Sequence, residues 1–117
     1  MISRQYRFHG LGSLNFVYKR GQTVRSANIG LRYIPNRRRK QFRAAVVVSR
    51  KVNKSAVVRN RIRRRVYEAL RLCQADIQIP MDMVFTIYND GVATMTFDQL
   101  HHDIEALIHK AMSTNSQ

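Results

Sequence analysis

Apolar side chains recur every three or four residues between Ser55 and Cys73, and this spacing predicts an amphipathic helix. On a wheel that turns roughly 100° per residue, six of them form one stripe suited to a core: Val58, Ile62, Val66, Ala69, Leu70 and Cys73. The opposite side carries Asn60, Arg64, Tyr67 and Arg71. The pattern therefore predicts that one side of this helix is buried and the other side faces solvent or a partner.

Two further helices are predicted, one near each end of the chain. Residues 11–19 form a short helix that Gly21 ends, with Leu14 and Tyr18 on a shared side. A longer helix begins at Thr96, where Thr96 and Gln99 match a capping box. Its core face consists of Phe97, Leu100, Ile104, Leu107, Ile108 and Ala111.

Three segments read as strands. Residues 23–34 alternate between apolar and polar side chains, and residues 42–49 contain a continuous apolar run that is typical of a central strand. The charged turn at residues 35–40 joins them, so the pair is predicted to form a hairpin. A third strand spans Met83–Tyr88 and ends in the turn Asn89–Gly91. The predicted order is αββαβα, an α/β fold (an α+β sandwich) in a single domain over residues 1–117.

The charge of the chain is divided unevenly along its length. Residues 1–72 contain 20 of the 21 Lys and Arg residues and one acid, Glu68, which gives a net charge of +19. Residues 73–117 carry a net charge of −5, and the whole chain carries +14. Because crowded like charges oppose compaction, this distribution indicates a polyanionic partner, and it is typical of a nucleic-acid-binding domain.

Five arginines gather in the predicted central helix, within the run Arg59-Asn60-Arg61-Ile62-Arg63-Arg64-Arg65. A solvated helix face usually mixes charges of both signs, but here Glu68 is the only nearby acid. These arginines repel one another unless phosphates lie between them. A nuclease that cuts RNA with its own metal ions would need clustered carboxylates, and this segment does not offer them.

The order of residues from Ser49 to Arg64 resembles the protein subunit of bacterial ribonuclease P. In that family a strand ends in Ser-Arg/Lys-Lys, and after a short loop a helix carries Arg-Asn-Arg-x-Lys/Arg-Arg. This chain has Ser49-Arg50-Lys51 followed by Arg59-Asn60-Arg61-Ile62-Arg63-Arg64. The predicted first helix, strands and last helix also fall in the family's order, so the resemblance covers nearly the whole chain.

The resemblance implies a compact α/β fold with a left-handed βαβ crossover. It also implies that the protein binds a catalytic RNA subunit and the single-stranded 5′ leader of precursor tRNA. That RNA performs the hydrolysis with Mg²⁺ that it mainly holds itself, so the protein would carry no catalytic residue and no metal ligand. By this resemblance the RNA-binding residues are Arg50, Lys51, Lys54, Arg59, Asn60, Arg61, Arg63, Arg64 and Arg65.

The resemblance also implies a leader-binding cleft between the first helix and the sheet. Its expected residues are Leu14, Tyr18, Val48 and Ser49. The family usually places two aromatic residues on the first helix, whereas this chain has Leu14 at the first place and Tyr18 at the second. Tyr18 can stack on a base, and Leu14 offers apolar contact only.

Several residues have an alternative chemical interpretation. His101, Glu105 and His109 have the spacing of metal ligands on a helix, although a solvated surface is the favoured interpretation. Cys73 fits the core stripe better than it fits a reactive thiol. Asp82 and Asp90 flank the third predicted strand as candidate Mg²⁺ ligands, and turn formation is favoured for them. Tyr6, Phe8 and Phe16 are candidates for base stacking or for the core.

The remaining features concern partners and compartment. One cysteine cannot form an internal disulfide, and the longest apolar run, Ala44–Val48, is too short to span a bilayer. We therefore expect a cytoplasmic protein without a membrane or small-molecule partner. The alternative function is a structural RNA-binding protein of the ribosomal type. A DNA-binding helix is disfavoured because no helix-turn-helix spacing precedes the arginines.

Overall fold

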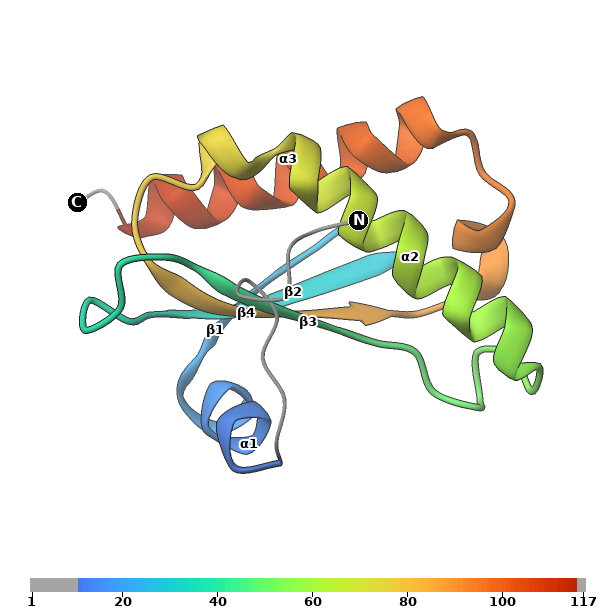
Figure 1. Ribbon diagram of the computed structural model, residues 1–117, viewed down its shortest axis with the longest axis horizontal. Helices are drawn as coiled ribbons and strands as arrows, with labels where there is room; N and C mark the ends of the chain where they lie inside the picture. Colours follow the sequence, from blue (N-terminus) through green and yellow to red (C-terminus); the bar gives the residue numbers. More distant parts are fainter. Residues whose placement is uncertain (1–10, 116–117) are drawn as a thin grey trace.

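A four-stranded sheet separates one helix from two others in the computed structural model, which describes residues 11–115 (Figure 1). The helix α1 lies on one face of this sheet, and α2 and α3 lie on the other (Figure 1). The mixed α and β class that the sequence predicts is therefore confirmed. The elements follow in this order: α1 (Leu11–Arg20), β1 (Gln22–Arg25), β2 (Ile29–Pro35), β3 (Arg43–Val47), α2 (Ala56–Leu72), the 3-10 turn η2 (Gln74–Asp76), β4 (Met81–Ile87), the 3-10 turn η3 (Asp90–Ala93) and α3 (Phe97–Asn115).

The segment predicted as one strand over residues 23–34 is two antiparallel strands. The chain reverses direction at residues 26–28, where the backbone N–H of Ser26 donates to the carbonyl of Ile29 at 2.8 Å. The Ser26 hydroxyl also accepts a hydrogen bond from the N–H of Ile29 at 3.3 Å. Alternation of apolar and polar residues continues through such a tight turn, so the pattern alone did not reveal the reversal. The hairpin is β1–β2, and the hairpin predicted between residues 23–34 and 42–49 is wrong.

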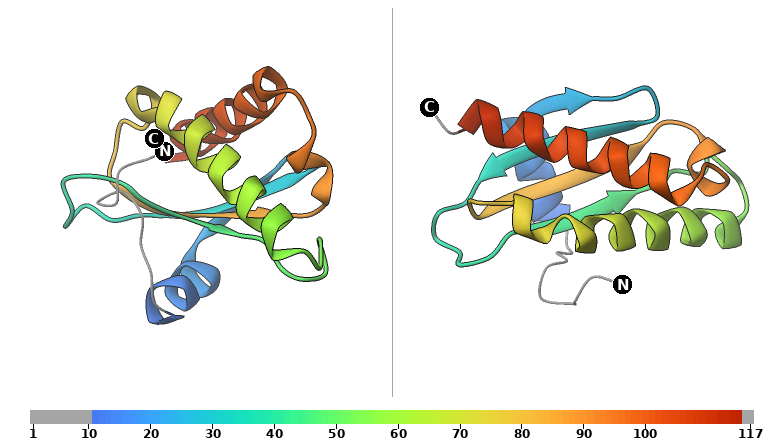
Figure 2. Two further views of the ribbon diagram at one scale, coloured as in Figure 1. Left: turned by 45° about the vertical axis from the view of Figure 1, so that its right-hand side comes forward. Right: turned by 90° about the horizontal axis from the view of Figure 1, so that it is seen from above.

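The third strand in the chain lies at an edge of the sheet. The spatial order is β1-β2-β4-β3, and β3 pairs with β4 alone, in parallel. The central position predicted for residues 42–49 is therefore wrong. Their continuous apolar run has another cause, because helices cover both faces of β3: Ala44 and Val46 face the main core, and Ala45 faces α1. The β3–α2–β4 connection is left-handed, as the resemblance implies (Figure 2).

The main core lies between the sheet and the two long helices. Ile62, Val66, Leu70 and Cys73 of the predicted stripe are buried in it, and Val58 is half-buried at its edge. Tyr67 corrects the prediction, since it is 7% exposed and belongs to this core instead of the solvent side. A long side chain in a helix leans back over the preceding turn, so the wheel position of its Cβ does not decide its burial.

Both long helices begin where the sequence predicts. The Ser55 hydroxyl accepts the N–H of Val58 at 3.3 Å, which caps α2. The Thr96 hydroxyl accepts the N–H of Gln99 at 3.2 Å at the start of α3. The Gln99 side chain donates to Asp103 at 2.9 Å instead of to the Thr96 backbone, so half of the predicted capping box is present. Among residues 11–115, no helix combines the length and the apolar character that crossing a bilayer requires.

Candidate nucleic-acid interface

The five arginines of residues 59–65 lie on α2, which packs on the face of the sheet opposite α1 (Figure 1). Arg61 and Arg64 are exposed, and neither forms an ion pair among the residues that the structure describes. Arg63 is half-buried and donates to the side-chain oxygen of Asn60, which is itself exposed. The two residues therefore hold each other on the helix surface, where amide and guanidinium groups both remain able to reach a ligand.

Arg65 lies at the edge of this surface. Its guanidinium donates to the backbone carbonyl of Met95, two residues before the start of α3. Its Nε is buried without a hydrogen-bond partner. Of the five arginines in the run, Arg65 is thus committed to linking α2 to the η3–α3 connection. The structure places it beside the other predicted RNA-binding residues, but part of its guanidinium is already hydrogen-bonded to the protein.

The loop before α2 is held together by Asn53. Its side-chain oxygen accepts the N–H of Ser55 at 2.8 Å, and its amide donates to Asp90 at 3.1 Å. Arg59 reaches back from the helix and donates to the carbonyls of Asn53 and Lys54 at 3.0 and 2.8 Å. These bonds fix the loop against the first turn of α2.

A hollow of about 590 Å³ opens between this loop and the helix. Its lining residues, all cationic except Ala56, are Arg50, Lys51, Lys54, Ala56 and Arg59. The N-terminus of α2 adds a partial positive charge beside them. Together with Asn60, Arg61, Arg63 and Arg64, these residues form what we call the basic surface. Its charge and its donors suit the phosphates of a nucleic acid.

A second group of candidate residues lies on the other face of the sheet. Tyr18 on α1 is 36% exposed, and the guanidinium of Arg32 on β2 lies 6.0 Å from the centre of its ring. Arg32 also donates to the carbonyl of Tyr18 and, at 3.3 Å, to that of Gly21. Carbonyls at the C-terminal end of a helix lack intrahelical partners, and Arg32 supplies one here. Arg32 therefore anchors α1 to the sheet and also lies against the Tyr18 ring. Leu14 is half-buried in the small core beneath α1.

Phe16 on α1 is also available to a ligand. Its side chain is 53% exposed, so it does not belong to the core, and base stacking stays a prediction. It lines a hollow of about 790 Å³ together with Ile34, Pro35, Asn36, Arg37, Arg38 and Asp82. Tyr6 and Phe8, the other aromatic candidates, lie outside the described residues.

The structure separates Val48 from the other expected leader-binding residues. Val48 is 7% exposed and packs in the main core, on the side of α2 and α3, whereas Leu14 and Tyr18 lie on the opposite face. Val47 stands in its place on that face, half-buried and packed, as Leu14 is, against the small core of Val17, Ala45 and Val84. Side chains alternate between faces along a strand, so a shift of one residue exchanges the two sides. Ser49 is exposed where β3 runs into the loop.

Sequence reasoning missed an aromatic residue on the α1 side of the sheet. Tyr88 directly follows β4 and is 42% exposed. A Cβ placed on Gly30 would lie 1.9 Å from the Tyr88 hydroxyl, so the glycine is what lets this ring lie over β2. The guanidinium of Arg25 is 5.9 Å from the ring centre. The sequence could have revealed Tyr88, because side chains alternate along a strand and residues 82, 84, 86 and 88 therefore share one face.

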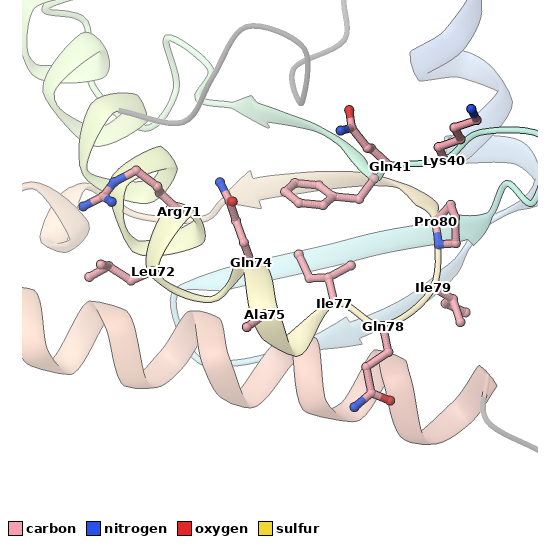
Figure 3. Close-up of a pocket in the computed structure, with 11 residues that line it drawn as sticks. Lys40, Gln41, Arg71, Leu72, Gln74, Ala75, Ile77, Gln78, Ile79 and Pro80 are labelled. Carbon is pink, nitrogen blue, oxygen red and sulfur yellow. The ribbon is translucent and has the colours of Figure 1, made fainter.

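Another hollow, of about 550 Å³, lies at the C-terminal end of α2, whereas the basic surface lies at its N-terminal end (Figure 3). Lys40 and Arg71 stand at its rim, and Gln74, Ile77 and Gln78 come from the chain between α2 and β4 (Figure 3). Arg71 also donates to Glu68 at 3.0 Å, and this interaction lowers the pKa of Glu68 to about 2. Arg71 is thus already paired, unlike Arg61 and Arg64.

The two aspartates considered as Mg²⁺ ligands have protein partners. Asp82 accepts two hydrogen bonds from Arg43, both at 2.9 Å, and one from Asn36 at 3.2 Å. Asp90 accepts the amide of Asn53. Both carboxylates therefore hold loops and strands in place.

Comparison with known proteins agrees with this arrangement. A family model described as Ribonuclease P matches residues 2–112. The chain belongs to the ribonuclease P protein family. The family resemblance drawn from the Ser49–Arg64 motif is thereby confirmed.

Two relatives are each called ribonuclease P protein component. The one from Chloroflexus aurantiacus is 43% identical over 110 residues, which cover 94% of this chain and 80% of the relative. The one from Roseiflexus castenholzii is 36% identical and covers 94% and 88%.

Solved ribonuclease P proteins share the fold. The protein from Staphylococcus aureus superposes with a TM-score of 0.79 at 24% identity, over 91% of this chain and 94% of that one. The protein from Thermotoga maritima gives a TM-score of 0.75 at 20% identity, over 83% and 89%.

Proposed function

We propose that this ribonuclease P protein binds the catalytic RNA of the enzyme through its basic surface and the 5′ leader of precursor tRNA through the α1 side of its sheet. The observation that carries the proposal is the exposure of Arg61 and Arg64 on α2 beside the cationic hollow. Arg61 and Arg64 have no carboxylate partner among the described residues, so phosphate is the chemistry that would neutralise them.

The leader would follow a path from α1 to the loop before α2. Tyr18 and Arg32 supply a ring and a cation near α1, and Tyr88 and Arg25 supply a second such pair near the end of β4. Val47 on β3 pairs with Thr86 on β4. Ser49 follows Val47 and Tyr88 follows Thr86 by two residues, so they lie on the same face of the sheet. Rings with neighbouring cations suit single-stranded nucleic acid, because every base has a face that can stack.

The chemistry would belong to the RNA. On the described part of the basic surface no carboxylates gather to hold the two metal ions that phosphodiester hydrolysis uses, and the nearest acids, Asp90 and Glu68, are hydrogen-bonded to protein groups. Mg²⁺ would therefore be held mainly by the partner RNA, and the protein would raise substrate affinity and screen phosphate repulsion. Because precursor tRNA is the proposed substrate, the protein would act in the cytoplasm.

A reconstitution experiment tests this function. The protein is added to precursor tRNA and to the catalytic RNA from the same organism, and 5′ cleavage is followed as Mg²⁺ is lowered. We expect faster cleavage at low Mg²⁺ with the wild-type protein and a much smaller gain with an Arg61→Ala/Arg64→Ala double variant. No change in rate with the cognate RNA would favour the alternative, a structural RNA-binding protein of the ribosomal type.

A further inference from the structure

The end of α2 and the middle of α3 bring together three side chains with different metal-binding atoms. Cys73 caps α2, and His101 and Glu105 lie one turn apart on α3. The Sγ of Cys73, a ring nitrogen of His101 and a carboxylate oxygen of Glu105 all lie within 4.8 Å of one another. The proposed RNA-binding function uses none of these residues, and the basic surface lies at the other end of α2.

We propose that Cys73, His101 and Glu105 form a Zn²⁺ site with three protein ligands and a fourth position open to water. Zn²⁺ binds thiolate, imidazole and carboxylate groups at about 2.0 to 2.3 Å, so its tetrahedral ligands stand about 3.3 to 3.6 Å apart. The His101 Nε2 and the Glu105 Oε2 are 3.9 Å apart. Closing the set requires movements of about 1 Å, which rotations of the partly exposed His101 and Glu105 side chains supply.

The imidazole of His101 is oriented for this role. Its ring stacks on Phe97, one turn earlier in α3, with 6.4 Å between ring centres and 12° between planes. Its Nε2 is buried and has no hydrogen-bond partner. A buried nitrogen without a partner is unfavourable, and a metal ion between His101 and Cys73 would satisfy it.

The electrostatic surroundings favour a cation. The carboxylates of Glu105 and Asp76 lie near the Cys73 thiol and supply negative charge there. This end of α2 also carries the negative end of the helix dipole, in the acidic part of the chain. When Zn²⁺ binds, the S–H bond breaks, the Zn–S bond forms and the proton passes to solvent.

The donor set distinguishes this site from the Mg²⁺ of the RNA. Mg²⁺ selects oxygen ligands in octahedral geometry, whereas a thiolate and an imidazole select Zn²⁺ and its spectroscopic substitute Co²⁺. Side-chain exposures of 33% for His101 and 41% for Glu105 give the ion an entry path and leave room for a water ligand. The bound ion would fasten the end of α2 to α3.

Co²⁺ titration of the full-length protein without a histidine tag tests the proposal. We expect one equivalent to bind with a thiolate-to-cobalt charge-transfer absorption, which Zn²⁺ then displaces. Cys73→Ala should abolish this absorption, and His101→Gln and Glu105→Gln should each weaken binding about 10- to 100-fold or more. His102→Gln is the matched control, because its side chain is exposed on the neighbouring side of α3, and it should bind as the wild type does.

Two outcomes would overturn the proposal. Absence of the charge-transfer absorption in the folded wild-type protein would show that the thiol does not bind metal. Equal affinity in wild type and Cys73→Ala would place the ion elsewhere, for example at His109 and Asp76, whose side chains approach to 3.7 Å. Circular dichroism checks the fold of each variant, and Glu105→Gln keeps the test decisive if Cys73→Ala is unstable. Neither result depends on whether the protein binds RNA.

Discussion

Arg43 and Asp82 face each other across the parallel strands β3 and β4 and form a two-point ion pair, with both nitrogen–oxygen distances at 2.9 Å. The Asp82 side chain is 7% exposed and that of Arg43 22%. Asn36 donates to the same carboxylate, so Asp82 ties the loop after β2 to the edge strand. The hydrogen bonds that Arg43 donates to Asp82 raise the pKa of Arg43, which remains charged.

Asp82→Ala should lower the free energy of unfolding by about 2 to 4 kcal/mol, because it leaves a partly buried guanidinium and an amide without their acceptor. Urea denaturation measures the loss. Asp98→Asn, at an exposed position in the first turn of α3, is the control and should cost less than about 1 kcal/mol. Equal losses in the two variants would show that the Arg43–Asp82 pair contributes no more than a surface charge.

Two glycines should respond differently to replacement by alanine. At Gly21 the new Cβ would lie 2.5 Å from the carbonyl oxygen of Val17 and 3.0 Å from that of Tyr33. Both are backbone atoms, so Gly21→Ala should destabilise the protein by about 1 to 3 kcal/mol. At Gly30 the Cβ would meet only the hydroxyl end of the exposed Tyr88, which can swing away, and the cost should stay below about 1 kcal/mol. Thermal unfolding of the two variants compares them, and the reverse order would contradict this placement of Tyr88.

The helical part of the fold could be predicted from the sequence because its signals are local. The 3.6-residue period of α2 and the capping hydroxyls of Ser55 and Thr96 act within one or two turns of the chain. The strand pairing could not be predicted, because it depends on contacts distant in sequence. Nothing within residues 42–49 shows that they pair in parallel with residues 82–86 instead of with the strand before them.

The candidate site divides in the same way. The residues of the basic surface follow one another along a loop and a helix, so a motif finds them together. The face of each β residue depends on register, and the apolar run Ala44–Val48 hid the alternation that separates Val47 from Val48. Cys73 approaches His101 and Glu105 only because α2 packs on α3, which no spacing along the chain reveals.

Glu68 should make a pH-dependent contribution to stability. Its pKa in the folded protein is lowered from 4.5 to about 2, first because of the hydrogen bond from Arg71. A lowered folded-state pKa contributes stability above the unfolded value, and this contribution is lost as the pH falls. The difference in unfolding free energy between wild type and Glu68→Gln should therefore be largest above pH 4.5 and should shrink toward pH 2. Urea denaturation over this range checks it, and a difference that grows on acidification would contradict the assignment.

Arg61 should contribute to the salt dependence of RNA binding. Its side chain is exposed on the basic surface and forms no ion pair among the described residues. Arg61→Ala should weaken assembly with the catalytic RNA and lower the slope of log affinity against log salt by up to about one unit, as for a lost phosphate contact. Lys110→Ala, in the acidic part of the chain, is the matched control and should leave the slope unchanged. An unchanged slope for Arg61→Ala would remove Arg61 from the interface.

Tyr18 and Tyr88 should act on the leader and not on the body of the tRNA. Each ring is partly exposed on the α1 side of the sheet with an arginine about 6 Å from its centre. Replacing either with alanine should cost about 1 to 3 kcal/mol in the affinity of the reconstituted enzyme for precursor tRNA, and little for mature tRNA, because stacking with a leader base is lost. Tyr88→Phe keeps the ring and should bind as the wild type does. If precursor and mature tRNA lose affinity equally, the rings do not stack on the leader and instead support the sheet. If Tyr88→Phe binds as weakly as Tyr88→Ala, the hydroxyl group of Tyr88 makes the contribution instead of its ring.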